Sequence, residues 1–222
     1  MIVHFGTVVL ATFVGILPIA NPFSTAVVFL TITEGFSEER RQQQARMACV
    51  YMAGVLITFL LAGTLIMTFF GISIPGLRIA GGLIIARIGF AMLNAQPENA
   101  MSDELRDEAV RKDDVAFSPL AMPMLSGAGS IAVTIGMAAE AGGADETLAI
   151  IVGIGLVAFV SWLVLRASGR VVRVLGATGM NAMGRILGFL LVCTAIQFIV
   201  DGAHQLLSSP EFMAPIMDAI GA

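Results

Sequence analysis

The chain has 222 residues, of which 57% are hydrophobic and 13% charged, with a formal net charge of −4 and a mean hydropathy of +0.91. A soluble domain carries about 25% charged residues, so this composition excludes a soluble globular protein and indicates a single-domain integral membrane protein with the lipid bilayer as a partner. The chain has no basic face interleaved with aromatic residues, which argues against a nucleic-acid partner.

Six apolar segments are long enough to cross a bilayer, which takes about 20 residues. In chain order they cover residues 2–33, 45–70, 77–93, 116–139, 147–165 and 183–207. The first segment lacks the basic start of a cleaved signal peptide, so we expect it to remain as the first span. The sequence therefore predicts an all-α membrane protein with six transmembrane helices.

The first segment is too long for one straight span and holds the sequence PIANP, from Pro18 to Pro22. A proline lacks the N–H group that the helical ladder needs, and its ring clashes with the preceding turn. We therefore expect a discontinuous helix, with two half-helices joined by unwound backbone at residues 17–22. Freed backbone at membrane depth is tolerated only where it lines a protein cavity.

The fourth segment repeats this pattern as PLAMP, from Pro119 to Pro123, followed by the small-residue run SGAGS at residues 126–130. Such a matched pair of interrupted segments is the best sequence pointer to a transporter binding site. Helices 1 and 4 are accordingly both predicted to be discontinuous.

A second landmark also repeats. Arg78 opens the third span and Arg185 the sixth, each followed by two apolar residues and a glycine. The proline motifs are offset by 101 (119 minus 18) and the arginines by 107 (185 minus 78), which argues for duplication. Since each half holds three spans, the second half enters from the opposite side, and the repeat is inverted. The predicted organisation is repeat 1 at residues 1–95, a cytoplasmic linker at 96–115 and repeat 2 at 116–222.

Basic residues gather in three of the loops between predicted spans, and cytoplasmic loops carry such an excess. We therefore place these loops in the cytoplasm and both termini outside it, in a multi-pass protein of the cell (inner) membrane. The basic loops carry Arg40, Arg41 and Arg46, then Arg106, Arg111 and Lys112, then Arg166, Arg170, Arg173 and Arg185.

The two breaks carry hydroxyl, amide and glycine residues and no Asp, Glu or Lys. A half-helix that begins at a break presents free N–H groups and a positive dipole end, which suit a carboxylate. Such a site favours a small neutral, zwitterionic or polar solute, although proline, glycine and serine also merely permit kinks and close helix packing. The predicted substrate-binding residues are Asn21, Pro22, Ser24, Thr25, Ser126, Gly127, Gly129 and Ser130, with Pro18, Pro119 and Pro123 as structural breaks.

No metal site or enzyme is expected. Cys49 and Cys193 are isolated in apolar runs, and a serine nucleophile at Ser126 or Ser130 has no base nearby. Arg87, deep in the third span, is interpreted as snorkelling or pairing locally rather than gating. No ATP-binding loop is present, so no cofactor is expected, and transport depends on a gradient. The lack of an acid at the breaks slightly favours Na⁺ coupling or uniport over H⁺ coupling.

The motifs as a whole resemble the MarC family of bacterial and archaeal membrane proteins. The resemblance rests on Asn21-Pro22, on GISIPGLRIAGG at residues 71–82, and on PLAMP with SGAGS. It implies a six-span inner-membrane protein of about this length. Two departures are Ala128, where the family usually has proline, and Arg87, where it usually has an aliphatic residue.

Some relatives in this family carry small neutral amino acids, and the family name comes from an association with multiple antibiotic resistance. The predicted function is therefore a secondary, alternating-access transporter of a small neutral amino acid such as alanine or glycine, in an undetermined direction. The alternatives are a multidrug efflux protein with a large pocket lined by Met and Phe, and a non-transporting channel or scaffold. A homodimer is compatible with so small a transporter.

Overall fold

The computed structural model describes residues 2–94 and 114–209, and these residues form helices and no strands. Five of the helices are long and apolar enough to cross a membrane, or six if one bent pair counts as a span. The all-helical membrane fold is thus confirmed, whereas most of the predicted linker at residues 96–115 lies outside the described residues. The elements are α1 (Ile2–Ala20), α2 (Pro22–Ile32), α3 (Glu38–Phe70), α4 (Ile74–Asn94), η2 (Ala116–Leu125), α6 (Ala128–Glu140), α7 (Ala144–Arg166) and α8 (Ser168–Leu207).

Helix α3 begins at residue 38, seven residues before the apolar segment that predicted it. Ser37 caps its start by accepting a hydrogen bond from the backbone N–H of Arg40 at 3.3 Å, and two glutamates in the first turn favour the helix dipole. The helix ends at Gly71, whose φ of 66° is left-handed, and the N–H of Ile72 donates to the carbonyl of Met67 at 2.9 Å.

Helix α8 is longer than predicted as well, because the basic segment expected to be a loop is helical from Ser168. Gly176, with φ 61° and ψ −179°, interrupts it, and the apolar part that could cross a membrane is Thr178–Leu207. The expected loop is therefore wrong for residues 168–175: these residues form a short helix that turns into the last span at a glycine.

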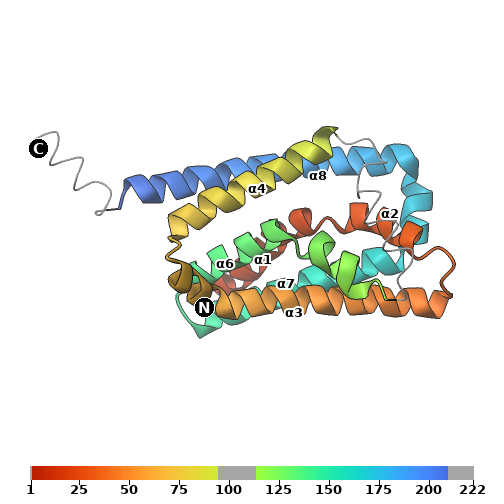
Figure 1. Ribbon diagram of the computed structural model, residues 1–222, viewed down its shortest axis with the longest axis horizontal. Helices are drawn as coiled ribbons and strands as arrows, with labels where there is room; N and C mark the ends of the chain where they lie inside the picture. Colours follow the sequence, from red (N-terminus) through yellow and green to blue (C-terminus); the bar gives the residue numbers. More distant parts are fainter. Residues whose placement is uncertain (1, 95–113, 210–222) are drawn as a thin grey trace, which may run out of the picture.

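Helices α4 and α8 run antiparallel and side by side along one edge of the molecule, opposite α3 (Figure 1). Glycines let their backbones approach closely, since a Cβ added at Gly89 would lie 2.9 Å from the carbonyl oxygen of Gly188, and one at Gly202 would lie 2.9 Å from that of Pro75. Small residues commonly allow this contact between membrane helices.

Gly188 and Gly184, one turn apart on α8, provide a matched test of this contact. A Cβ at Gly188 would meet Met92 at 2.9 Å and the Gly89 carbonyl oxygen at 3.0 Å, whereas nothing lies within 4 Å of one at Gly184. We expect Gly188→Ala to destabilise the protein by about 1–3 kcal/mol through overpacking. Gly184→Ala should leave stability unchanged or slightly raised, since alanine favours helix. Thermal unfolding in detergent measures both, and equal stability of the two variants would contradict the observed packing.

The other helices pack on one another as follows, with α3 also contacting α7 and α1 also contacting α6 and α8. Helix α1 packs on α7, and η2 packs on α3. Likewise α6 packs on α3 and on α4, while α2 packs on α7 and on α8. Helix α1 begins, and the described part of α8 ends, at the same end of the molecule (Figure 1).

Candidate functional site

The first break is a single residue, Asn21, which has φ 40° and ψ 64° in the left-handed region. The predicted unwinding over residues 17–22 is therefore wrong, and Pro18 lies inside α1. The N–H of Asn21 still donates to the carbonyl of Leu17 at 3.0 Å. The reason lies with Pro22: it disfavours the α region for the residue before it and suits the first position of a new helix. Asparagine tolerates the left-handed conformation that results.

The polar groups beside this break bond to one another. The Asn21 side chain accepts from the backbone N–H of Ser24 at 3.3 Å and donates from Nδ2 to Ser24 Oγ at 2.7 Å. The hydroxyl of buried Thr25 donates to the Asn21 carbonyl at 3.1 Å. Asn21 thus caps α2 and bonds with Ser24 and Thr25, and a ligand at this helix start must displace the Asn21 side chain.

The second break is wider than the first. Segment η2 forms π-type turns, in which the N–H of Leu120 donates to the Val115 carbonyl at 3.2 Å and that of Ser126 donates to the Ala121 carbonyl at 2.9 Å. Its φ and ψ angles are non-helical at Ser118 and Met122, each of which precedes a proline with a cis peptide bond. The axis bends by 65° between η2 and α6.

The greater width of the second break alters the offset between the two predicted repeats. The start of α6 is offset from that of α2 by 106 (128 minus 22), and the start of α7 is offset from that of α3 by the same amount (144 minus 38). The proline motifs are offset by only 101 residues. The second break is therefore five residues longer than the first (106 minus 101). These two offsets of 106 are close to the offset of 107 between Arg78 and Arg185, and in the predicted repeat Ser130 corresponds to Ser24.

The start of α6 has no side-chain cap, in contrast to the start of α2. Its N-cap is Gly127, where an added Cβ would lie 2.7 Å from the Pro123 carbonyl oxygen. The Ser126 hydroxyl donates to the Ala121 carbonyl at 2.8 Å. Ser130, in the first turn, is fully buried, and its hydroxyl has no hydrogen-bond partner in the described part of the chain. The α6 start is therefore the better of the two for binding a ligand.

The two breaks lie next to each other across α1 and α6. A Cβ at Gly129 would lie 3.1 Å from Cγ2 of Ile19, two residues before Asn21, and 3.4 Å from Cγ1 of Ile85 on α4. Nδ2 of Asn21 also lies 3.6 Å from the sulfur of Met92 on α4. Ile19, Ile85 and Met92 were not among the predicted site residues, because nothing in a single apolar run distinguishes them.

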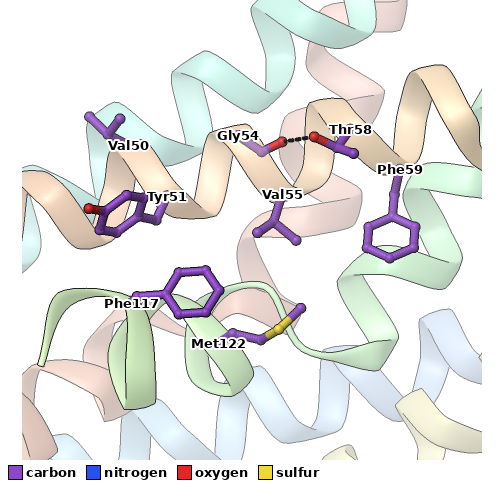
Figure 2. A pocket seen from close by; sticks show the side chains of 8 residues that line it. All are labelled: Val50, Tyr51, Gly54, Val55, Thr58, Phe59, Phe117 and Met122. Carbon is purple, nitrogen blue, oxygen red and sulfur yellow. Dashed lines mark hydrogen bonds between the residues drawn. The ribbon is translucent and has the colours of Figure 1, made fainter.

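A separate apolar cavity of about 390 Å³ lies between α3 and η2 (Figure 2). Tyr51 and Phe117 meet edge to face across it, with ring centroids 5.6 Å apart, and Met122 of the second break points into it. The hydroxyl of Thr58 already donates to the Gly54 carbonyl at 2.8 Å, so the lining offers little free polarity. The other lining residues are Val50, Val55 and Phe59.

Arg87 is exposed on α4, on the same face as exposed Leu83, Ile84 and Phe90. The opposite face of α4 carries Ile85, which meets Gly129. Arg87 therefore points away from the two breaks, on the side expected to face lipid. No group of three or more His, Cys, Asp or Glu residues that could hold a metal occurs in the described ranges.

Comparison with known proteins gives one consistent result. A model of the MarC family, described as "MarC family integral membrane protein", matches residues 6–207. The inner membrane proteins MarC of Salmonella typhimurium (strain LT2) and of Escherichia coli O6:H1 are each 42% identical over 207 residues, which cover 87% of this chain and 93% of theirs. No solved structure matches the chain.

Proposed function

The chain belongs to the MarC family of integral membrane proteins, as a multi-pass protein of the inner membrane, and from this premise we propose that it is a secondary transporter of a small neutral amino acid such as alanine or glycine. The observation that carries the proposal is the uncapped start of α6 beside the first break, with the buried hydroxyl of Ser130, which has no partner among residues 2–94 and 114–209. Free N–H groups at a helix start bind a carboxylate.

An inverted repeat supports this function, because it supplies two related arrangements of one fold. Elements α1, α2, α3 and α4 correspond in order to η2, α6, α7 and α8. Under this correspondence the contact of α1 with α7 mirrors that of η2 with α3, and the contact of α4 with α6 mirrors that of α8 with α2. Such folds place substrate near the midplane between the repeats.

In this proposal, the residues of the two breaks bind opposite ends of the substrate. Gly127, Gly129 and Ser130 bring N–H groups and a hydroxyl to the carboxylate, with Ser126 beside them. Asn21, with Pro22, Ser24 and Thr25 around it, lies toward the amine, which donates hydrogen bonds to backbone carbonyls of the break. None of these side chains is charged, so a zwitterion fits better than a substrate with a net charge.

Alternating access in this proposal is driven by a Na⁺ or H⁺ gradient or by the gradient of the solute itself. The proposal keeps the predicted orientation, in which the basic ends of α3, α7 and α8 face the cytoplasm, as such residues usually do, and both termini lie outside it. Hydrolysis of ATP is not part of the proposal, because the sequence has no phosphate-binding loop.

The efflux alternative has one observation in its favour, the cavity between α3 and η2. It is lined by aromatic and aliphatic side chains and Met122, and its volume of about 390 Å³ is at the lower end for ligand pockets. A lipophilic compound suits this lining, whereas an amino acid does not.

Flux into liposomes distinguishes the two functions. We expect the purified protein to take up radiolabelled alanine saturably, with competition by glycine and none by aspartate or lysine, because the breaks carry no charged side chain. Imposed Na⁺ and H⁺ gradients identify the coupling ion, and protein-free liposomes are the control. Transport of a lipophilic dye without alanine flux would reject the proposal in favour of efflux.

A further inference from the structure

Arg78 and Glu140 form an ion pair between the start of α4 and the end of α6. The Arg78 side chain is only 14% exposed, and that of Glu140 is 47% exposed. Cβ of Arg78 packs against Gly202 of α8, so the pair lies at one end of the α4–α8 contact. This is the end of the molecule opposite the basic residues of α3 and α7.

The register of the two halves gives this pair a counterpart at the other end of the molecule. Arg185 corresponds to Arg78 at an offset of 107 (185 minus 78), and Glu140 corresponds to Glu34 at an offset of 106 (140 minus 34). Glu34 follows α2 closely, as Glu140 ends α6, and α2 packs on α8 just as α6 packs on α4. The counterpart positions therefore carry the same two charges on corresponding elements.

The counterpart pair is not formed in this structure. Glu34 and Arg185 are both exposed, and neither has an ion-pair partner within residues 2–94 and 114–209. Arg41, at the start of α3, does not replace Arg185, because it pairs with Glu38 at 3.6 Å and donates to the Thr33 carbonyl at 3.3 Å. One of the two related ion pairs is formed in this structure and the other is not.

We propose that Arg78–Glu140 and Arg185–Glu34 are two alternating gates, the first closed and the second open in this arrangement of the helices. This inference rests on the proposed transport function and its orientation, and adds the residues that control access on each side. An exchange of one pair for the other conserves the number of ion pairs. This exchange offsets the loss of one ion pair with the gain of another, and a small difference in free energy is what allows both states to be populated.

Cross-linking of cysteines at positions 34 and 185 tests the gates without any substrate. In a background with Cys49→Ala and Cys193→Ala, we expect Glu34→Cys with Arg185→Cys to cross-link weakly. The yield should rise about fivefold when Arg78→Gln opens the other gate. The control is Arg87→Gln, which removes the same charge from the same helix and should leave the yield unchanged.

The charge swap Arg78→Glu with Glu140→Arg restores the pair, and should return the cross-linking yield to the starting value. If Arg78→Gln does not fold, Glu140→Gln, at a more exposed position, takes its place. Equal yields with and without Arg78→Gln or Glu140→Gln, or no rescue by the swap, would overturn the gates. If alanine is transported but the cross-linking yields are equal, the gate proposal alone is rejected. If the yield shifts but alanine is not transported, the proposed substrate is rejected and the gate proposal remains.

Discussion

Replacing Ser130 with alanine is expected to reduce alanine transport sharply without destabilising the protein. The hydroxyl is fully buried and has no hydrogen-bond partner in the described residues, so it contributes nothing to the fold that the structure accounts for. A buried hydroxyl without a partner costs about 1–3 kcal/mol, and its removal should leave the free energy of unfolding unchanged or raise it by about 1 kcal/mol. A group retained at such a cost is typical of a binding site.

The loss of transport follows from the position of Ser130 in the first turn of α6. The N-cap of this helix, Gly127, has no side chain to bond the free N–H groups. In the proposed function, the substrate carboxylate binds these groups. One hydrogen bond to a charged group is worth about 1.5–3 kcal/mol, which corresponds to a decrease in apparent affinity of roughly 10-fold to 150-fold.

Two matched variants separate function from stability at this break. Ser126→Ala removes a hydroxyl that donates to Ala121 at 2.8 Å, so it should lower stability by about 0.5–1.5 kcal/mol. Thr134→Val removes a buried hydroxyl one turn further along α6, which donates to the Ser130 carbonyl at 2.7 Å, and should retain transport. Alanine uptake into liposomes and equilibrium unfolding in mixed micelles are the measurements. Full transport by Ser130→Ala would contradict the proposal that the substrate binds at the start of α6.

The apolar runs located the described helices well but not their polar ends. Hydropathy measures the length of chain that the bilayer accepts, whereas Glu, Gln and Arg are good helix formers in water. Helix α3 therefore extends back to Glu38, and α8 back to Ser168, through segments that the sequence pattern assigns to loops. To predict these ends from the sequence, one must recognise Ser37 as a capping residue and Gly176 as a kink, because hydrophobicity does not indicate either.

The prolines located both breaks but not their shapes. Pro18 and Pro119 open matching motifs in the sequence, yet α1 continues past Pro18 while η2 opens into wide turns around Pro119 and Pro123. The amide of Asn21, a predicted substrate-binding residue, bonds to Ser24 in this structure, which the sequence did not indicate. The approach of Ile19 to Gly129 depends on the packing of helices that are far apart in the sequence, which local sequence patterns do not encode.

The second large effect is expected at Asn21, where conformation and capping are combined in one residue. Asn21→Ala should destabilise the protein by about 2–3 kcal/mol, because alanine resists the left-handed conformation by about 1–2 kcal/mol and the lost cap costs about 1 kcal/mol. Asn21→Gly should cost less, since glycine adopts φ 40° freely and replaces a capping asparagine with a loss of a few tenths of a kcal/mol.

Transport should fall at least tenfold in both variants, because neither retains the amide that the proposed substrate engages when it displaces Ser24. Asn181→Ala, a change of the same kind at a half-buried position of α8 outside both proline motifs, serves as the control and should transport normally. Unfolding in mixed micelles and alanine uptake are measured on the same preparations. Equal stability of the alanine and glycine variants would contradict the left-handed backbone. The glycine variant keeps the backbone break and lacks only the side chain. Normal uptake by Asn21→Gly would therefore show that the Asn21 side chain caps α2 but does not bind substrate.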